Sequence, residues 1–91
     1  MYKMVSKKVV LNNSDGLHAR AAALFVREAN KFASEINLEA HNDKVNGKSI
    51  IGIMSLGAFT GEEIIIEADG VDEEEAVERL AYLVEKEFIN L

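Results

Sequence analysis

Two side chains near the start of the sequence are of the types that handle a phosphoryl group. The segment GLHAR places His18 and Arg20 after a glycine and at the start of an alanine-rich stretch. An imidazole can act as a nucleophile and form a covalent intermediate, although histidine is a poor N-cap. The free N–H groups of a helix's first turn attract anions, and an arginine fork binds them. The spacing therefore indicates either a site that accepts and releases a phosphoryl group or an ordinary surface histidine in a strand–helix turn.

The elements that must position these residues follow from the hydrophobic pattern. Alternating apolar and polar residues predict strands at 4–11, 36–40, 43–46 and 62–69. Apolar stripes at helical spacing predict helices at 19–32 and 73–88, and a glycine-interrupted apolar segment predicts a short helix at 50–56. The polar stretch His41-Asn42-Asp43 is a plausible turn between the second and third strands. On this interpretation His18 is the N-cap of the first helix.

Capping residues mark the ends of two predicted helices. Ser49 is the expected N-cap of the short helix, and Gly57 is its expected stop. Asp72 and Glu75 give a capping-box-like start to the final helix. The acidic residues that follow Asp72 suit the positive end of the helix dipole.

The element order βαββαβα predicts an α+β fold. Strands with one polar face and helices with one apolar stripe imply a four-stranded antiparallel sheet covered on one face by three helices. The 91 residues contain no proline, no low-complexity linker and no repeat of constant period. We therefore expect one domain spanning residues 1–91 around a single hydrophobic core.

Composition excludes several classes of function. Without cysteine there is neither a disulfide framework nor a thiolate metal site, and the only two histidines, His18 and His41, fall on different elements. We therefore expect no metal and no cofactor, and we expect His41 to be an ordinary loop residue. The formal net charge of −6 argues against nucleic-acid binding. There is no signal-peptide core and no apolar run of about 20 residues, so we expect a cytoplasmic protein without membrane insertion.

Three motifs, in this order, give the chain a family resemblance. They are GLHAR followed by AALFV, then KVNGKSIIGIMSLG, and then GVDEEEA. The sequence resembles the histidine-containing phosphocarrier protein (HPr) family of the bacterial sugar phosphotransferase system over essentially its full length. The resemblance implies the HPr-like open-faced β-sandwich, whose element order agrees with the pattern above.

The resemblance also implies roles for His18 and Arg20. His18 corresponds to the residue that enzyme I phosphorylates and that passes the phosphoryl group to sugar-specific enzyme IIA domains. Arg20 would be its phosphate-binding partner. The protein would then be a phosphoryl carrier, which is a substrate of phosphotransfer and not a free-standing enzyme.

Ser49 corresponds to the regulatory serine of firmicute-type members of the family. In those members HPr kinase/phosphorylase modifies this serine, and the product binds the catabolite control repressor. Judged by its position alone, Ser49 is an ordinary helix N-cap. A phosphate there would add about −1.5 to −2 charges, which a helix N-terminus tolerates.

A partner-binding surface is expected on the short helix. Ile50, Ile51 and Met54 lie in a helix too short to bury every apolar side chain, and these three residues form the predicted docking patch. Ile53 and Leu56 are expected to pack inward instead. A ring of positive charge around the patch would suit transient, electrostatically steered encounters. The residues expected to supply it are Arg20, Arg27 and Lys48.

The sequence departs from the family pattern at two positions beside His18. Ala21 stands where the family usually has proline; it adds an N–H donor, so phosphate binding should survive, and Ala21 is still expected at the partner interface. Asp15 replaces a small neutral residue, and its carboxylate could repel a phosphoryl group. Segments 23–31 and 44–56 are also similar to a regulatory relative, the catabolite-repression HPr-like protein, which lacks the active histidine. The alternative function is therefore regulation, mainly through phospho-Ser49, with His18 slow or idle.

Overall fold

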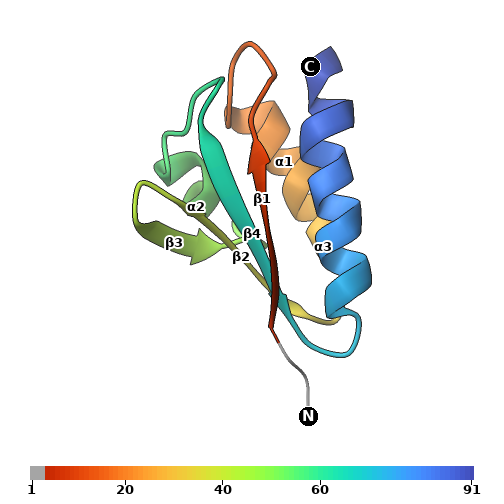
Figure 1. Cartoon of the computed structure of the whole chain (residues 1–91). Coiled ribbons are helices and arrows are strands. Elements are labelled where there is room, and N and C mark those ends of the chain that lie inside the picture. Colours follow the sequence, from red (N-terminus) through yellow and green to blue (C-terminus); the bar gives the residue numbers. More distant parts are fainter. Residues whose placement is uncertain (1–3) are drawn as a thin grey trace.

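The computed structural model describes residues 4–91 and confirms the α+β fold (Figure 1). Its strands and α-helices follow the predicted order: β1 (Val5–Val10), α1 (Ala19–Ala29), β2 (Glu35–Ala40), β3 (Asp43–Asn46), α2 (Ile50–Ser55), β4 (Glu63–Asp69) and α3 (Glu73–Tyr82). The strands form one antiparallel sheet in the spatial order β1-β4-β2-β3, and the helices cover one of its faces.

The strand register places the core on the face of the sheet that the helices cover. Val9 of β1 lies opposite Ile64 of β4, and Leu38 of β2 lies opposite Ile66. All four side chains are buried. Burying a side chain of this size stabilises the fold by about 1.5–3 kcal/mol. The core thus fixes the sheet from which the functional loops project.

A two-residue turn joins β2 to β3, as the polar stretch at this point predicts. His41 and Asn42 have φ angles of 56° and 65°, and the pair Ala40 and Asp43 closes the hairpin. Left-handed conformations at both central positions are typical of a type I′ turn, and histidine and asparagine adopt them more readily than most residues. His41 therefore stands at the end of a tight hairpin.

Helix α1 is shorter than the predicted helix 19–32. It ends at Ala29, and the Phe32 N–H then donates to the Ala29 carbonyl at 3.1 Å, which makes a tighter turn. The chain must reverse here to begin β2 at Glu35. Phe32 still packs against the core from outside the helix, which explains why it continues the apolar stripe in the sequence.

Asp72 precedes α3 but does not cap it, so the capping-box prediction for Asp72 and Glu75 is wrong. The Asp72 carboxylate instead accepts hydrogen bonds from the backbone N–H groups of Ala33 and Ser34, at 2.9 and 3.0 Å, and from the Ser34 hydroxyl. These bonds, led by that from the Ser34 side chain, lower the pKa of Asp72. The carboxylate therefore joins the start of α3 to the start of β2, a contact between distant segments.

The final helix follows the predicted path over 73–88 without remaining α-helical. Beyond Tyr82 the chain forms a π-helical turn over Leu83–Glu87 and then a 3-10 turn over Phe88–Asn90. Within the π-helical turn, the carbonyl of Glu85 accepts a hydrogen bond from the side-chain amide of Asn12 at 3.1 Å. The loop that follows β1 is thereby tied to the C-terminal segment.

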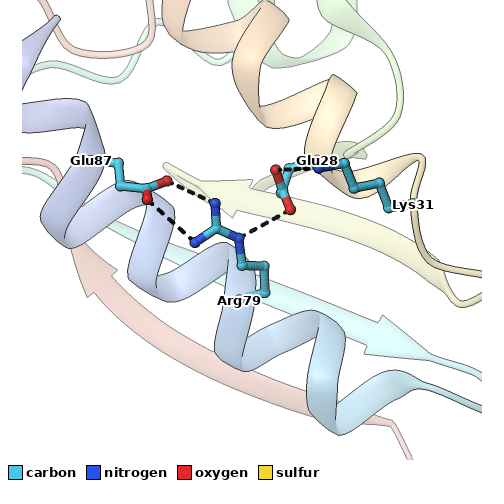
Figure 2. A network of polar contacts seen from close by, with 4 residues as sticks. All are labelled: Glu28, Lys31, Arg79 and Glu87. Atoms are coloured by element: carbon cyan, nitrogen blue, oxygen red, sulfur yellow. Dashed lines mark hydrogen bonds and ion pairs between the residues drawn. The ribbon is translucent and has the colours of Figure 1, made fainter.

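An ion-pair network joins the last turn of α1 to the C-terminal helix (Figure 2). Arg79 of α3 donates through Nε to Glu28 at 3.0 Å and through Nη2 to Glu87 at 2.8 Å. Lys31 adds a second cation, 3.3 Å from the Glu28 carboxylate. The hydrogen bond from Arg79 is the main reason that the pKa of Glu28 is lowered. The network holds the far end of α1, at the opposite end of the helix from His18.

Candidate functional site

His18 is the N-cap of α1, as the sequence predicts. Its backbone is extended, with φ of −84° and ψ of −178°, and its carbonyl accepts the Ala22 N–H at 2.9 Å. Its ring nitrogen Nδ1 accepts the backbone N–H of Arg20 at 3.2 Å. The imidazole thus takes the place of the hydroxyl or carboxylate that usually caps a helix.

This hydrogen bond also distinguishes the two ring nitrogens of His18. Because Nδ1 accepts a hydrogen bond, the neutral ring carries its proton on Nε2. Nε2 is buried and has no hydrogen-bond partner among residues 4–91. Nδ1, at the open end of the helix, is therefore the nitrogen with a lone pair available for attack on an incoming group.

The neighbours of His18 on α1 differ sharply in exposure. Arg20 is exposed, and within the described residues its guanidinium makes no hydrogen bond or ion pair, so it is free to bind an anion. Ala21 is fully buried, at 0% exposure. The expectation that Ala21 contacts a partner is therefore wrong for its side chain, since it packs in the core below the site.

The turn that carries His18 rests on the loop between α2 and β4 (Figure 1). The Leu17 N–H donates to the Ala58 carbonyl at 3.1 Å. Gly16 has a φ of +62°, and a Cβ on it would lie 2.5 Å from the Ala58 oxygen and 2.9 Å from the Phe59 Cα. Only glycine fits this backbone contact, so the two loops are seated directly on each other.

The residues before Gly16 close the same turn. The Asn13 side-chain amide donates to the Gly16 carbonyl at 2.8 Å, and Asn13 itself is buried. Asp15 is exposed in this turn, three residues before His18. The spacing of polar residues in the sequence did not reveal the role of Asn13 in shaping the turn.

Ser49 lies at the N-cap of α2, as predicted. Its hydroxyl oxygen accepts the Gly52 N–H at 3.0 Å, and its backbone is extended, with φ of −120° and ψ of 115°. The helix ends at Ser55, and Gly57 follows with a φ of +62°, which confirms the predicted stop. Ser49 is partly exposed, so its hydroxyl lies at the surface that α2 presents.

The exposure of the predicted docking patch is confirmed. Its three side chains are 41%, 81% and 43% exposed for Ile50, Ile51 and Met54, while Ile53 and Leu56 are buried. Phe59 was not predicted to belong to this surface, yet it is 68% exposed on the loop beneath the His18 turn. The sequence did contain a signal for this exposed residue: it is an aromatic residue between Gly57 and Gly61, in a segment whose apolar residues follow neither a helical nor a strand period.

The expected ring of cations is incomplete. The Lys48 ammonium donates to the Phe32 carbonyl at 2.8 Å and is therefore held at the C-terminal end of α1. The Lys48 ammonium is therefore not a free cation at the rim of the docking patch, because the Phe32 carbonyl, just beyond α1, binds it. Arg27 is exposed and, among the described residues, has neither an ion pair nor a hydrogen bond through its side chain.

His41 is more than the ordinary loop residue that its polar turn suggests. Its Nε2 contacts the carboxylate of Glu62, at the base of the loop that carries Phe59. This hydrogen bond is the main cause of a raised pKa at His41 and of a lowered pKa at Glu62. No pattern in the sequence indicates this pair, because the two residues lie far apart in the chain, on the β2–β3 turn and just before β4.

His18 lines none of the hollows that residues 4–91 form at the start of β2, at the β2–β3 turn and at the start of α3. The first of these, of about 390 Å³, lies between the start of β2 and Lys48, and is lined by Ser34, Asn37 and Asn46 among others. Within residues 4–91, no cluster of three or more His, Cys, Asp or Glu side chains could hold a metal ion. In the same residues, no helix is both long and apolar enough to cross a membrane.

Comparison with known proteins gives consistent matches. The family described as "PTS HPr component phosphorylation site" matches residues 5–86. The HPr-like protein Crh of Bacillus subtilis is 52% identical over 84 residues, which cover 92% of this chain and 99% of that protein. An HPr of Thermoanaerobacter tengcongensis has a TM-score of 0.88 at 50% identity, covering 92% of this chain and 94% of that one. A phosphocarrier protein HPr of Bacillus anthracis has a TM-score of 0.86 at 51% identity, covering 90% and 98%.

Proposed function

Because the chain belongs to the HPr family of the phosphotransferase system, we propose that it accepts a phosphoryl group on His18 from phospho-enzyme I. It then passes the group to sugar-specific enzyme IIA domains in the cytoplasm. Members of this family are phosphocarrier proteins rather than catalysts, so the chain is a substrate of both transfers. The observation that carries the proposal is the placement of Nδ1 at the N-terminus of α1, with Nε2 enclosed.

The transfer step follows from the state of the His18 ring. The Arg20 N–H first releases Nδ1, and the freed Nδ1 lone pair attacks the phosphorus of the donor. A bond from Nδ1 to phosphorus forms, and the donor's bond to phosphorus breaks with its electron pair returning to the donor. Nε2 keeps its proton throughout, so no general base on this chain is needed. Transfer onward reverses the same step with the acceptor as nucleophile. A surface site suits this exchange because a second protein must bring the reacting atom.

Two groups would stabilise phospho-His18. The backbone N–H of Arg20, which now donates to Nδ1, lies beside the position of the phosphoryl oxygens, as do the other free N–H groups of the first turn of α1. The free Arg20 guanidinium can add a fork of charge-assisted hydrogen bonds. Both interactions can also form with the phosphoryl group while the donor still carries it, so they favour acceptance of the group by His18.

A second function is favoured by the 52% identity to Crh. In this alternative the protein acts mainly through phosphorylation of Ser49 by HPr kinase/phosphorylase, and the phosphoprotein binds a catabolite control repressor. Ser49 is partly exposed at the N-cap of α2, next to the docking patch. Phosphate there would place about two negative charges beside Ile50 and Ile51.

Incubation with enzyme I and phosphoenolpyruvate tests the carrier function. The unmodified protein should gain acid-labile phosphate, and His18→Ala should gain none. The variant should remain folded, with a melting temperature lowered modestly because the substitution removes the side-chain cap of α1. Labelling that persists in His18→Ala would place the acceptor elsewhere and contradict the proposal. A protein that takes acid-stable phosphate on Ser49 from the kinase but no phosphate from enzyme I would be the regulatory alternative.

A further inference from the structure

One carboxylate, that of Glu62, binds the backbone of the loop between α2 and β4. Glu62 accepts the backbone N–H of Phe59 through Oε1 and contacts Nε2 of His41 through Oε2. The Glu62 N–H in turn donates to the Phe59 carbonyl at 3.1 Å. Glu62 therefore binds both backbone groups of Phe59 while a charged partner from the β2–β3 turn binds its other oxygen.

The same loop also contacts the turn that carries His18. Ala58 accepts the Leu17 N–H, and the backbone at Phe59 lies against Gly16. Figure 1 shows the β1–α1 loop and the α2–β4 loop at the same end of the molecule. The side chains of His41 and Glu62 thus act on the same loop that contacts the turn presenting His18.

The surroundings of His41 favour its charged form. Its Nε2 contacts the Glu62 carboxylate, the main cause of its raised pKa, and the backbone of Leu56, just after α2, contributes to the shift in the same direction. Only the protonated imidazole has an N–H on both nitrogens, so a neutral ring cannot donate to two acceptors from both sides. Asp43 is the next charge in the same turn, and further charges line a hollow of about 170 Å³ that His41 shares. These are Lys8, Glu39 and Glu63.

We propose that His41 and Glu62 form a proton-controlled clamp that positions Phe59 as a partner contact beside His18. When His41 is charged, the clamp joins the β2–β3 turn, the end of α2 and the loop. When His41 loses its proton, the attraction to Glu62 is lost and the loop loosens. The partner would be the protein that exchanges the phosphoryl group, offering an apolar pocket for an aromatic ring, so this part rests on the proposed carrier function.

Phe59 needs such a clamp to be useful as a contact. It lies between Gly57 and Gly61, which have φ of +62° and +87° and open space around them, so the loop has little intrinsic stiffness. An exposed aromatic side chain contributes most to binding when its position is fixed before the partner arrives. Fixing the Phe59 backbone through Glu62 meets this requirement, whereas core packing does not, since the ring is 68% exposed.

The clamp can be tested without any phosphotransfer, by NMR titration of the unmodified protein. The Phe59 and Leu17 amide shifts should follow the His41 ring signal, with a midpoint above the ordinary value of about 6.5. In Glu62→Gln the His41 midpoint should fall and the Phe59 inflection should disappear. Glu63→Gln is the matched control: it removes a neighbouring charge that lines the same hollow but leaves the bonds between Glu62 and Phe59 in place, so the Phe59 inflection should remain. If the Phe59 amide shift does not change over the pH range in which His41 titrates, the clamp is overturned.

Kinetics with enzyme I then test the partner contact. Over the His41 titration, the KM for the carrier should rise several-fold with pH while kcat changes little. His41→Gln should remove that part of the pH profile, and Phe59→Ala should raise KM and remove it as well. A KM profile identical in the parent and His41→Gln overturns the positioning role. If His18 accepts no phosphate at any pH, the carrier function fails, and the NMR titration still decides the clamp.

Discussion

The backbone N–H of Arg20, and not its guanidinium, binds Nδ1 of His18. This hydrogen bond of 3.2 Å orients the imidazole through the peptide chain. Among the described residues, the Arg20 side chain makes no hydrogen bond or ion pair, so its charge is available to an anion. Orientation of the nucleophile and binding of the phosphoryl group are thus divided between two parts of one residue, which allows them to be tested separately.

Replacing Arg20 with lysine should slow phosphotransfer without disturbing the fold. Lysine keeps the charge and the backbone N–H, but it loses the planar fork of donors. Loss of one charge-assisted hydrogen bond should reduce the rate by about tenfold. The measurement is the rate of His18 phosphorylation by enzyme I, with the melting temperature as the control. Parent-like kinetics in the lysine variant would make Arg20 a simple surface charge.

Asp15→Ser should shift the phosphorylation equilibrium toward phospho-His18. The carboxylate is exposed in the turn before His18, and a negative charge near the phosphoryl group disfavours the phosphorylated state. Since exposed like charges couple weakly in water, the shift should be about two- to fivefold at low salt and smaller at high salt. The ratio of phosphorylated to free protein at equilibrium with enzyme I measures it. An unchanged ratio at low salt would mean that the Asp15 carboxylate points away from the site.

Phosphate on Ser49 should weaken phosphorylation of His18 by enzyme I. The charge lies at the favourable end of α2, so the helix should persist, and the effect should arise at the docking patch. Rates are to be compared between the enzymatically phosphorylated and the unmodified protein. Ser49→Ala treated with the kinase is the control, because it cannot take the phosphate. Equal rates would leave Ser49 as a helix cap alone.

Gly16→Ala should destabilise the His18 turn more than Gly57→Ala destabilises its loop. Both glycines have a φ of +62°, but an added Cβ meets the Ala58 oxygen at 2.5 Å in the first case and nothing within 4 Å in the second. The shared left-handed backbone costs each variant about 1–2 kcal/mol, so the difference between them reports the steric clash. Urea unfolding of both variants measures it, and equal losses would mean that the two loops separate freely.

The pair of Glu28 and Arg79 should stabilise the protein at neutral pH and less so in acid. The pKa of Glu28 is lowered, chiefly by the hydrogen bond from Arg79, so its contribution is present above the unfolded pKa and is lost as pH falls through the folded one. A double-mutant cycle with Glu28→Gln and Arg79→Met should give a coupling of about 1 kcal/mol at pH 7. The coupling should decrease as the pH falls below the ordinary glutamate pKa of 4.5 and the carboxylate takes up its proton. A coupling that is unchanged by acid would contradict the assignment to the charged carboxylate.

Local signals in the sequence predicted the parts of the fold that local chemistry determines. Ser49 followed by Gly57 predicts both ends of α2, because a cap and a stop act within a few residues of their position. The N-cap position of His18 followed from the glycine before it and the helical stripe after it. Strand alternation likewise predicts which face of β4 is buried.

What could not be predicted depends on contacts between distant segments. Asp72 has the residue type of an N-cap, yet the N–H groups of Ala33 and Ser34 bind its carboxylate instead. The sequence predicts Lys48 as a cation at the rim of the docking patch, but in the fold its ammonium binds the Phe32 carbonyl. The pairing of His41 with Glu62 is of the same kind, since neither residue's neighbours in the sequence indicate the other.

Strand β1 leaves the ribosome well before β4, the strand with which it pairs. Within the described residues β1 pairs only with β4, which begins at Glu63, after α1, the β2–β3 hairpin and α2. The hairpin can close in microseconds, whereas pairing of β1 must wait for a long loop to close. Until then β1 is unpaired on both sides, and even in the finished sheet it remains an edge strand. Its lysines, Lys7 and Lys8, are the kind of residue that discourages pairing with another chain. Synthesis of β4 therefore covers one side of β1, whereas the other side depends on Lys7 and Lys8 both during and after folding.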